Sequence, residues 1–380
     1  MHWYTGHPLS ANAPPPPLST IKHLTLVGHG NVSLDIARLL LSDPNSLSRL
    51  DIPQHVVEHL KTSTIEHINI VSRRGPAQVA FTAKELREVM NMPSAALKPI
   101  PSTLFDDLGS SKLTRQQTRV LDLMRKGSRV PFGTTNKTWS LEFLRTPISI
   151  DIVGRTGPKR TIFDMNKLDE QGRAQPTGQT EVQHSDLVVT SLGYHSDAFS
   201  ATVSSSTTRE SSRHEIVQED QWHDPKLGRV CTSTHGRVID VEGRRVHNVY
   251  ASGWAANGAR GVLAGTMYDA YDVADTMAEE YLASEKLEIT NSEPGLSSAD
   301  TPPIRGRVYP LGTGEDLPSS DMGGMQGDTY PGWLERVVGT KRIVMYHDWQ
   351  RVNTEEIRRG KEQGKERERM TWKEVDAFLA

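Results

Sequence analysis

Two rhythms of apolar and polar positions alternate along the first part of the chain. A short apolar run at 23–28 is followed by 31–42, where apolar side chains recur at helical spacing, and then by a second apolar run at 67–72. Strand, helix and strand in this order are typical of a βαβ unit with parallel strands. The polar insert 43–66 between them predicts an additional helix near 54–62.

The same kind of pattern continues to residue 194. A helix is predicted over 82–90, and 138–153 alternates in the manner of strands. In 182–194 an acidic residue precedes an apolar run, which is typical of a strand that closes a parallel sheet. The prediction for this part is therefore an α/β domain with a Rossmann-like parallel sheet.

The remainder of the chain is less regular. Residues 199–213 are rich in Ser and Thr and predict a loop, and 237–254 predicts strands before a glycine-rich turn. A helix is expected from about 261 to 283. Residues 287–332 are rich in Ser, Pro and Gly, which favours a flexible insert, whereas the charged tail 348–380 favours helix.

Composition narrows the function only slightly. The 380 residues carry 44 Lys and Arg against 47 Asp and Glu, so the overall charge gives no argument for nucleic acid as a partner. The single cysteine, Cys231, excludes an internal disulfide, a cysteine-ligated iron–sulfur cluster and a zinc site with several cysteines. The chain shows no metal-ligand spacing and no catalytic triad, so we expect no catalytic side chain and no metal, and the chemistry is expected to come from cofactors.

A glycine-rich turn lies between the first strand and its helix. Gly28 permits a tight turn and Gly30 allows a phosphate to approach the backbone amides at the start of the helix. Ser33 stands at the third position of the dinucleotide fingerprint, where a glycine is usual. The alternative is a glycine turn with no ligand, but the strand before it and the amphipathic helix after it favour dinucleotide binding.

Two adjacent arginines, Arg73 and Arg74, follow the second strand. At this position of a dinucleotide-binding fold an arginine suits the 2′-phosphate of NADP, because its guanidinium offers a planar fork of donors. The alternative is a solvated charge pair at the end of a strand. Their distance from Gly30 exceeds the usual ~20 residues, and the insert 43–66 accounts for it. Glu85 can reach a ribose hydroxyl or an arginine, or it lies on the surface without a role.

Two further features leave alternatives open. Trp254 lies in a glycine-rich turn before a helix, where its ring can stack on a flat ligand or pack in a core. Arg115 and Arg119 recur at helical spacing and form one basic face, which is either a solvated surface or a docking patch for an acidic partner.

Four stretches of the chain resemble the mitochondrial adrenodoxin-reductase type of ferredoxin–NADP⁺ reductase, in the order of that family. The string RRGPAQVAFTAKE is the most specific part of the resemblance. Shorter similarities occur in WYTGHP, TWSLEFLRTP and VVTSLGYHS. The four stretches are GHGNVSLDIARLLL (28–41), VSRRGPAQVAFTAKELREVM (71–90), SGWAANGARGVLAGTM (252–267) and DWQRVNTEEIRRGKEQGKERERM (348–370).

This resemblance implies an NADPH-dependent flavoprotein reductase. In the family an NADP-binding domain is inserted into a discontinuous FAD-binding domain, and electrons pass from NADPH to FAD and then singly to a small [2Fe–2S] ferredoxin. The implied domains are a linker or edge remnant (1–20), an NADP-binding domain (21–194) and the C-terminal part of an FAD-binding domain (195–380). The family's location implies the mitochondrial matrix, with at most peripheral association with the inner membrane.

The resemblance also assigns residues by motif. The turn would bind the NADP pyrophosphate, the two arginines its 2′-phosphate with Glu85 nearby, the second glycine-rich turn the flavin, and the basic helix the ferredoxin. The implied cofactor-binding residues are Gly28, His29, Gly30, Asn31, Val32, Arg73, Arg74, Glu85, Trp254, Gly261, Val262 and Leu263, and the implied partner-binding residues are Arg115 and Arg119.

The sequence also departs from the family pattern. Family members have a glycine-rich FAD-binding strand, turn and helix before their WYNGxP-like segment, whereas here Met1 stands just before Trp3. We therefore expect an N-terminally truncated chain in which the first FAD-binding βαβ half is missing. Arg260 adds bulk and charge beside the expected flavin. Two rival hypotheses remain, a non-catalytic NADP-binding fragment without flavin and a different NADPH–flavin oxidoreductase of the glutamate synthase type. The latter lacks the RRGPxQVAFTxKE string.

Overall fold

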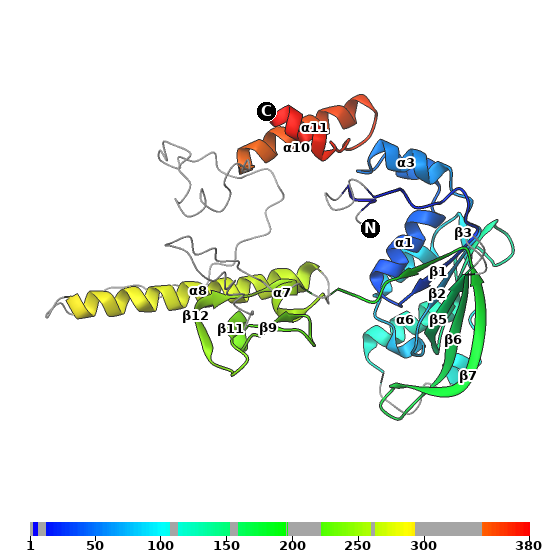
Figure 1. Ribbon diagram of the computed structural model, residues 1–380, viewed down its shortest axis with the longest axis horizontal. Coiled ribbons are helices and arrows are strands. Elements are labelled where there is room, and N and C mark those ends of the chain that lie inside the picture. Colours follow the sequence, from blue (N-terminus) through cyan, green and yellow to red (C-terminus); the bar gives the residue numbers. More distant parts are fainter. Residues whose placement is uncertain are drawn as a thin grey trace, which may run out of the picture. The chain divides into compact units, whose positions relative to one another are not determined.

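The chain forms two compact units, Met1–Leu192 with Glu335–Ala380, and Gly193–Leu334. The computed structural model describes residues 3–6, 13–106, 113–152, 159–194, 196, 222–259, 263–292 and 344–380 (Figure 1).

A five-stranded parallel sheet forms the centre of the first unit. Its order is β3–β4–β2–β1–β8, so that β1 lies between β2 on one side and β8 on the other. The sequence order therefore switches direction at β1, and in open α/β sheets ligands bind beyond the carboxyl ends of the strands at such a point. The strands are β1 (His23–Val27), β2 (His67–Val71), β3 (Ala95–Leu97), β4 (Lys137–Glu142) and β8 (Leu187–Thr190).

Helices cover one face of this sheet because alternate strand residues are apolar. Ile68 and Ile70 of β2 and Trp139 of β4 are fully buried there, in one core with Leu34 and Leu86 of the helices. The helices of this part are α1 (Asn31–Leu41), α2 (Pro44–Leu47), α3 (Gln54–Lys61), α4 (Ala83–Met90), α5 (Thr103–Asp106) and α6 (Arg115–Lys126), with a 3₁₀ helix at Pro76–Gln78. The expected βαβ unit and the helix within the insert are confirmed.

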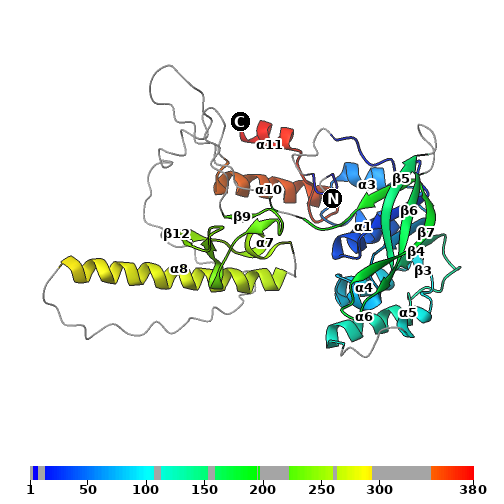
Figure 2. The same cartoon turned by 60° about the horizontal axis from the view of Figure 1, so that its bottom comes forward.

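A three-stranded antiparallel meander covers the other face. It consists of β5 (Arg145–Ile152), β6 (Lys159–Leu168) and β7 (Ala174–Ser185), and both views place it on the far side of the sheet from α1 (Figures 1 and 2). A hydrogen bond between the hydroxyls of Thr25 and Ser185 joins the two layers. The single strand expected over 182–194 is divided between two strands. β7 ends at Ser185 and belongs to the meander, whereas β8 pairs with β1 in the parallel sheet.

The C-terminal residues belong to the first unit. The helices α10 (Tyr346–Glu362) and α11 (Trp372–Leu379) pack on each other around Met370, Val375 and Leu379. The segment 363–371 between them makes polar contacts with residues 49–54, which are part of the insert 43–66. Lys365 Nζ donates to the carbonyl of Ile52 at 2.8 Å, and Arg369 Nε donates to Asp51 at 2.8 Å. The compact units thus differ from the expected division, which grouped these residues with 195–334.

In its described residues, the second unit contains two small hairpins, two α-helices and a 3₁₀ helix at Thr234–Gly236. The long helix α8 begins at Leu263, near the expected start, and continues to Ser292, so 287–292 are helix and not part of the expected flexible insert. The expected loop 199–213 and residues 293–332 lie outside the described residues. The elements are β9 (His223–Asp224), β10 (Arg229–Val230), β11 (Arg237–Ile239), β12 (Arg245–Tyr250), α7 (Gly253–Asn257) and α8 (Leu263–Ser292).

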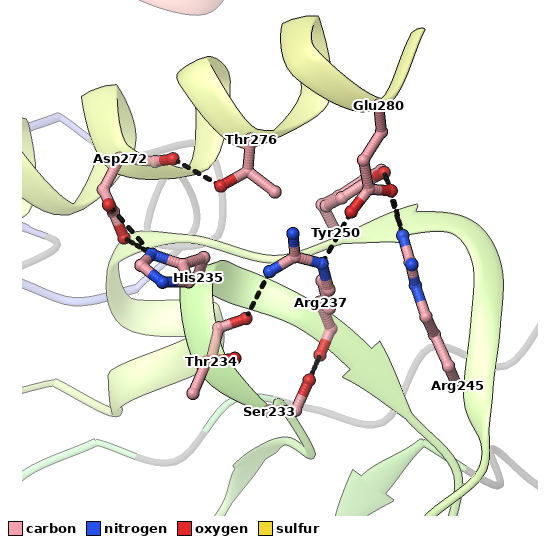
Figure 3. Close-up of polar contacts among 9 residues, drawn as sticks. All are labelled: Ser233, Thr234, His235, Arg237, Arg245, Tyr250, Asp272, Thr276 and Glu280. Atoms are coloured by element: carbon pink, nitrogen blue, oxygen red, sulfur yellow. Dashed lines mark hydrogen bonds and ion pairs between the residues drawn. The ribbon is translucent and has the colours of Figure 1, made fainter. Parts of the chain in front are cut away.

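Ion pairs and hydrogen bonds fasten one hairpin to α8 (Figure 3). The carboxylate of Glu280 accepts from the hydroxyl of Tyr250 and from the guanidinium groups of Arg237 and Arg245. In the 3₁₀ helix directly before β11, His235 Nδ1 pairs with the carboxylate of Asp272 at 2.8 Å. In the described parts of the chain, no helix is both long and apolar enough to cross a membrane.

Candidate functional site

The glycine-rich turn at 28–30 lies at the switch point of the sheet. Gly28 N donates to the carbonyl of Val71 at 2.8 Å, and Ser191 N donates to the carbonyl of Val27 at 2.8 Å, so the turn joins the ends of β2 and β8. Gly28 has φ +128°, and a Cβ at this position would lie 2.1 Å from the carbonyl oxygen of Ser191. Only glycine fits this approach of two backbones.

The N-terminus of α1 is open to an anion. Gly30 is the N-cap with φ −113°, no side chain caps the helix, and a Cβ on Gly30 would meet no atom within 4 Å. The side chain of Asn31 is turned away, because its Oδ1 accepts from Thr82 N at 3.0 Å. Backbone N–H groups at such an end carry partial positive charge and are suited to a phosphate. Ser33, the departure from the fingerprint, is buried and donates to the carbonyl of Gly28.

The side chain of His29 packs inside the fold, whereas the resemblance assigns this residue to the cofactor through its backbone amide. Its ring is buried against Phe143, with ring centroids 4.8 Å apart, and Nε2 donates to the carbonyl of Ile70 at 2.8 Å. Burial lowers the pKa of His29 to about 4, so the ring is neutral at physiological pH. The carbonyl of His29 accepts from Ala80 N at 2.9 Å, which fixes the turn to the segment after the two arginines.

Arg73 and Arg74 are both exposed at the end of β2. Within the described residues neither guanidinium takes part in a hydrogen bond or ion pair, whereas their backbone carbonyls are held by the meander. Gly75 and the 3₁₀ helix Pro76–Gln78 follow at once. Since Val27 and Val71 are neighbours in the sheet, the arginine pair and the open helix end project from adjacent strand ends.

Glu85 lies in the first turn of α4 and is half buried. One of its carboxylate oxygens is buried without a hydrogen-bond partner among the described residues. Its charge helps, after burial itself, to raise the pKa of Asp35 on α1, which places Glu85 beside that helix. No ion pair between Glu85 and Arg73 or Arg74 is formed among the described residues.

The second glycine-rich turn belongs to the other unit. Trp254 on α7 is 55% exposed and stacks on Tyr194 at 5.9 Å between ring centroids. It is not a core residue, which removes one of the two interpretations of its role. Leu263, the first residue of α8, is 86% exposed. Gly261 and Val262 lie outside the described residues.

The basic helix forms as expected. Arg115 and Arg119 are exposed on α6, and the opposite face, with Leu121 and Met124, is buried. Gln117 Nε2 donates to the carbonyl of Ala77 at 2.9 Å, so α6 is joined to the 3₁₀ helix beside the arginine pair. Among the described residues, no cluster of side chains is suited to a metal ion.

Comparison with known proteins gives consistent results. No protein-family model matches the chain. NADPH:adrenodoxin oxidoreductase of Homo sapiens is 29% identical over 97% of this chain, and that of Salvelinus fontinalis is 28% identical over 97%. The chain spans 65% and 64% of the length of these two relatives. NADPH-ferredoxin reductase FprA of Mycobacterium tuberculosis is 32% identical over 72% of this chain and 55% of its own length.

Solved structures agree on the fold. The structure of Mycobacterium tuberculosis FprA in complex with NADPH has a TM-score of 0.68 and 24% identity, covering 99% of this chain and 70% of that chain. The parallel α/β fold expected from the sequence is therefore confirmed. Over nearly its whole length the chain is similar to the adrenodoxin-type ferredoxin–NADP⁺ reductases.

Proposed function

We propose that this protein is an NADPH-dependent flavoprotein reductase that passes electrons through FAD to a [2Fe–2S] ferredoxin. The observation that carries the proposal is the exposed pair Arg73 and Arg74, whose guanidiniums have no partner among the described residues, near the N-terminus of α1, where Gly30 has no side chain to cap the helix. A dinucleotide with an extra phosphate on its ribose matches both features, since each presents donors to an anion.

NADP binding would use the first unit alone. The amides following Gly30 bind the pyrophosphate, the close contact of Gly28 with β8 leaves space above the sheet, and the arginine pair binds the 2′-phosphate. The half-buried carboxylate of Glu85 would accept a hydrogen bond from a ribose hydroxyl. The neutral ring of His29 keeps the turn in place without adding charge.

Flavin binding would use the second unit. The exposed ring of Trp254 and the exposed side chain of Leu263 offer an apolar surface suited to a flat ring. When bound, FAD would supply the ability to take a hydride from NADPH and to release electrons one at a time. The protein's own contribution is to hold the rings in place, and the site needs no titrating side chain for this.

The acceptor would dock on α6. Arg115 and Arg119 present two positive charges on one exposed face, which suits a small acidic ferredoxin. Gln117 of α6 donates a hydrogen bond to Ala77, in the 3₁₀ helix that follows the arginine pair, and the docking face belongs to the same unit as the proposed NADP site. The relatives named as mitochondrial proteins support a mitochondrial location, which we propose to be the matrix, with at most peripheral contact with the inner membrane.

A second candidate is an NADP-binding protein without flavin. It is favoured by the exposure of Trp254 and Leu263. Under this hypothesis the surface at Trp254 is covered by another polypeptide or remains open.

An anaerobic absorbance measurement tests the proposal. The chain is incubated with FAD, desalted and titrated with NADPH, with NADH as the control. Reductase function predicts that flavin bands are retained and that NADPH bleaches them more readily than NADH. A colourless chain that still binds NADPH would support the second candidate. A chain that binds neither cofactor would contradict both.

A further inference from the structure

The backbone of the arginine segment 72–74 is held by the meander. Three successive carbonyl oxygens each accept a hydrogen bond from residues at or beyond the end of β4. Because consecutive peptide groups are all engaged in hydrogen bonds, the segment has little freedom to rotate, while both arginine residues remain exposed. The bonds are Arg145 N to Ser72 O (2.8 Å), Asn166 Nδ2 to Arg73 O (2.9 Å) and Leu144 N to Arg74 O (3.2 Å).

Asn166 is the only side chain among these three donors. It lies on β6, the central strand of the meander, and is 7% exposed. Its Nδ2 donates both to the carbonyl of Arg73 and to Thr146 Oγ1 at 2.8 Å, and its backbone N donates to the carbonyl of Leu144 at 2.8 Å. The side-chain amide is therefore fixed by a neighbour on β5 as well as by its own backbone.

An irregularity in the meander brings Asn166 to this position. The β6–β7 pairing shifts register between Asp164 and Asn166, which is the signature of a bulge, and bulges re-aim side chains. Leu144, which Asn166 binds, has φ +59°, a left-handed conformation that is uncommon for a branched side chain. Such backbone persists only where the surroundings enforce it, and here the bonds to Arg74 and Asn166 do so.

We propose that Asn166 is a positioning residue that sets the preference for a 2′-phosphorylated ligand by fixing the Arg73–Arg74 pair. This inference rests on the proposed NADP site. A guanidinium binds a phosphate best through two parallel hydrogen bonds, so its value depends on direction. Asn166 never touches the ligand. It acts through the carbonyl of Arg73, and therefore its effect should be confined to ligands that carry the 2′-phosphate.

Two small probes isolate this effect in the 380-residue chain. 2′,5′-ADP carries the additional phosphate and 5′-ADP does not, and calorimetry measures the binding of each. Asn166→Leu removes the donor with little change in volume, and Gln179→Leu is the matched control on an exposed position of β7. We expect Asn166→Leu to weaken 2′,5′-ADP about tenfold while the affinity for 5′-ADP changes little. Gln179→Leu should leave both unchanged.

A merely structural role is distinguished by a double-mutant cycle. In the background Arg73→Ala with Arg74→Ala, replacing Asn166 should have no further effect on 2′,5′-ADP. Equal loss of both probes, or an undiminished effect in that background, would overturn the inference. If Asn166→Leu does not fold, Asn166→Asp keeps the shape, lacks the donor, and is put through the same comparison with the same criteria.

Failure of the inference and failure of the proposed site give different results. If the unmodified chain does not prefer 2′,5′-ADP over 5′-ADP, the NADP site itself is wrong. If that preference exists and depends on Arg73 and Arg74 but not on Asn166, only the positioning role is wrong.

Discussion

The backbones of Gly28 and Ser191 are in contact just beyond the carboxyl ends of β1 and β8. A Cβ on Gly28 would lie 2.1 Å from the carbonyl oxygen of Ser191, and the φ of +128° at Gly28 disfavours any side chain. This contact sets the floor of the candidate cofactor site. Gly30, the second glycine of the turn, has a different role, because a Cβ there would meet no described atom within 4 Å.

The two glycines therefore respond differently to the same change. Gly28→Ala should destabilise the fold by more than about 1 kcal/mol, because the backbone of Ser191 must move. Gly30→Ala should fold normally but weaken NADPH binding, because the methyl group occupies space that a phosphate needs. Thermal unfolding and NADPH titration of both variants measure this. If Gly30→Ala binds NADPH as tightly as the unmodified chain, the pyrophosphate assignment is wrong.

Glu280 predicts a pH dependence of stability. The hydroxyl of Tyr250, and then Arg237 and Arg245, hold its pKa at about 2 against an ordinary 4.5. A carboxyl with a lowered pKa in the folded state stabilises above its unfolded pKa and loses that contribution as the pH falls through its folded pKa. Glu280→Gln should therefore lower the melting temperature near neutral pH, and the difference from the unmodified chain should shrink between about pH 4.5 and about pH 2.

Circular dichroism melts at several pH values measure that difference. Glu279→Gln is the matched control, because Glu279 precedes Glu280 on α8 and is exposed. A difference for Glu280→Gln that stays constant across this pH range would show that the network in Figure 3 does not depend on its charge.

The basic helix predicts salt-dependent partner binding. Arg115→Glu with Arg119→Glu should weaken binding of an acidic [2Fe–2S] ferredoxin by at least about tenfold at low salt. The loss should diminish at high salt, because counterions screen the attraction. Surface plasmon resonance at two ionic strengths measures it, with Lys61→Glu on α3 as the control. Unchanged affinity at low salt would remove α6 as the docking site.

Lys365 predicts that the C-terminal helices depend on a buried charge. Its side chain is 1% exposed, pairs with Glu368 and donates to the carbonyl of Ile52. Lys365→Met should cost about 3–5 kcal/mol, because it leaves the carboxylate of Glu368 without its cation and the carbonyl of Ile52 without its donor. Urea unfolding measures the loss, and Lys361→Met, an exposed position of α10, should have almost no effect. Equal stability of the two variants would contradict the buried ion pair.

Local patterns in the sequence predicted the elements that surround the NADP site. β1, α1 and β2 follow from apolar spacing, and Gly28, Gly30, Arg73 and Arg74 follow from their places at the ends of these elements. Such features depend on residues that are close in sequence, where periodicity and turn chemistry act directly.

Contacts over longer separations were not predicted. The strand β7 is polar at most positions and mostly exposed, so it carries no apolar alternation to reveal it. The rings and amides involved bind backbone carbonyl oxygens: His29 donates to that of Ile70, and Asn166 to that of Arg73. Every residue has such an oxygen, so no sequence pattern identifies the acceptor. The packing of 344–380 on the insert depends in the same way on the carbonyl of Ile52.

The central claim is that the site at the end of β1 and β2 selects NADPH through its 2′-phosphate. The most direct test is equilibrium titration of the unmodified chain and of Arg73→Ala with Arg74→Ala against NADPH and NADH. Arg87→Ala, which removes an exposed arginine from α4, is the control. The account predicts a loss of at least about tenfold for NADPH, with little change for NADH and none for Arg87→Ala. Equal loss for both nucleotides, or none for either, would contradict it.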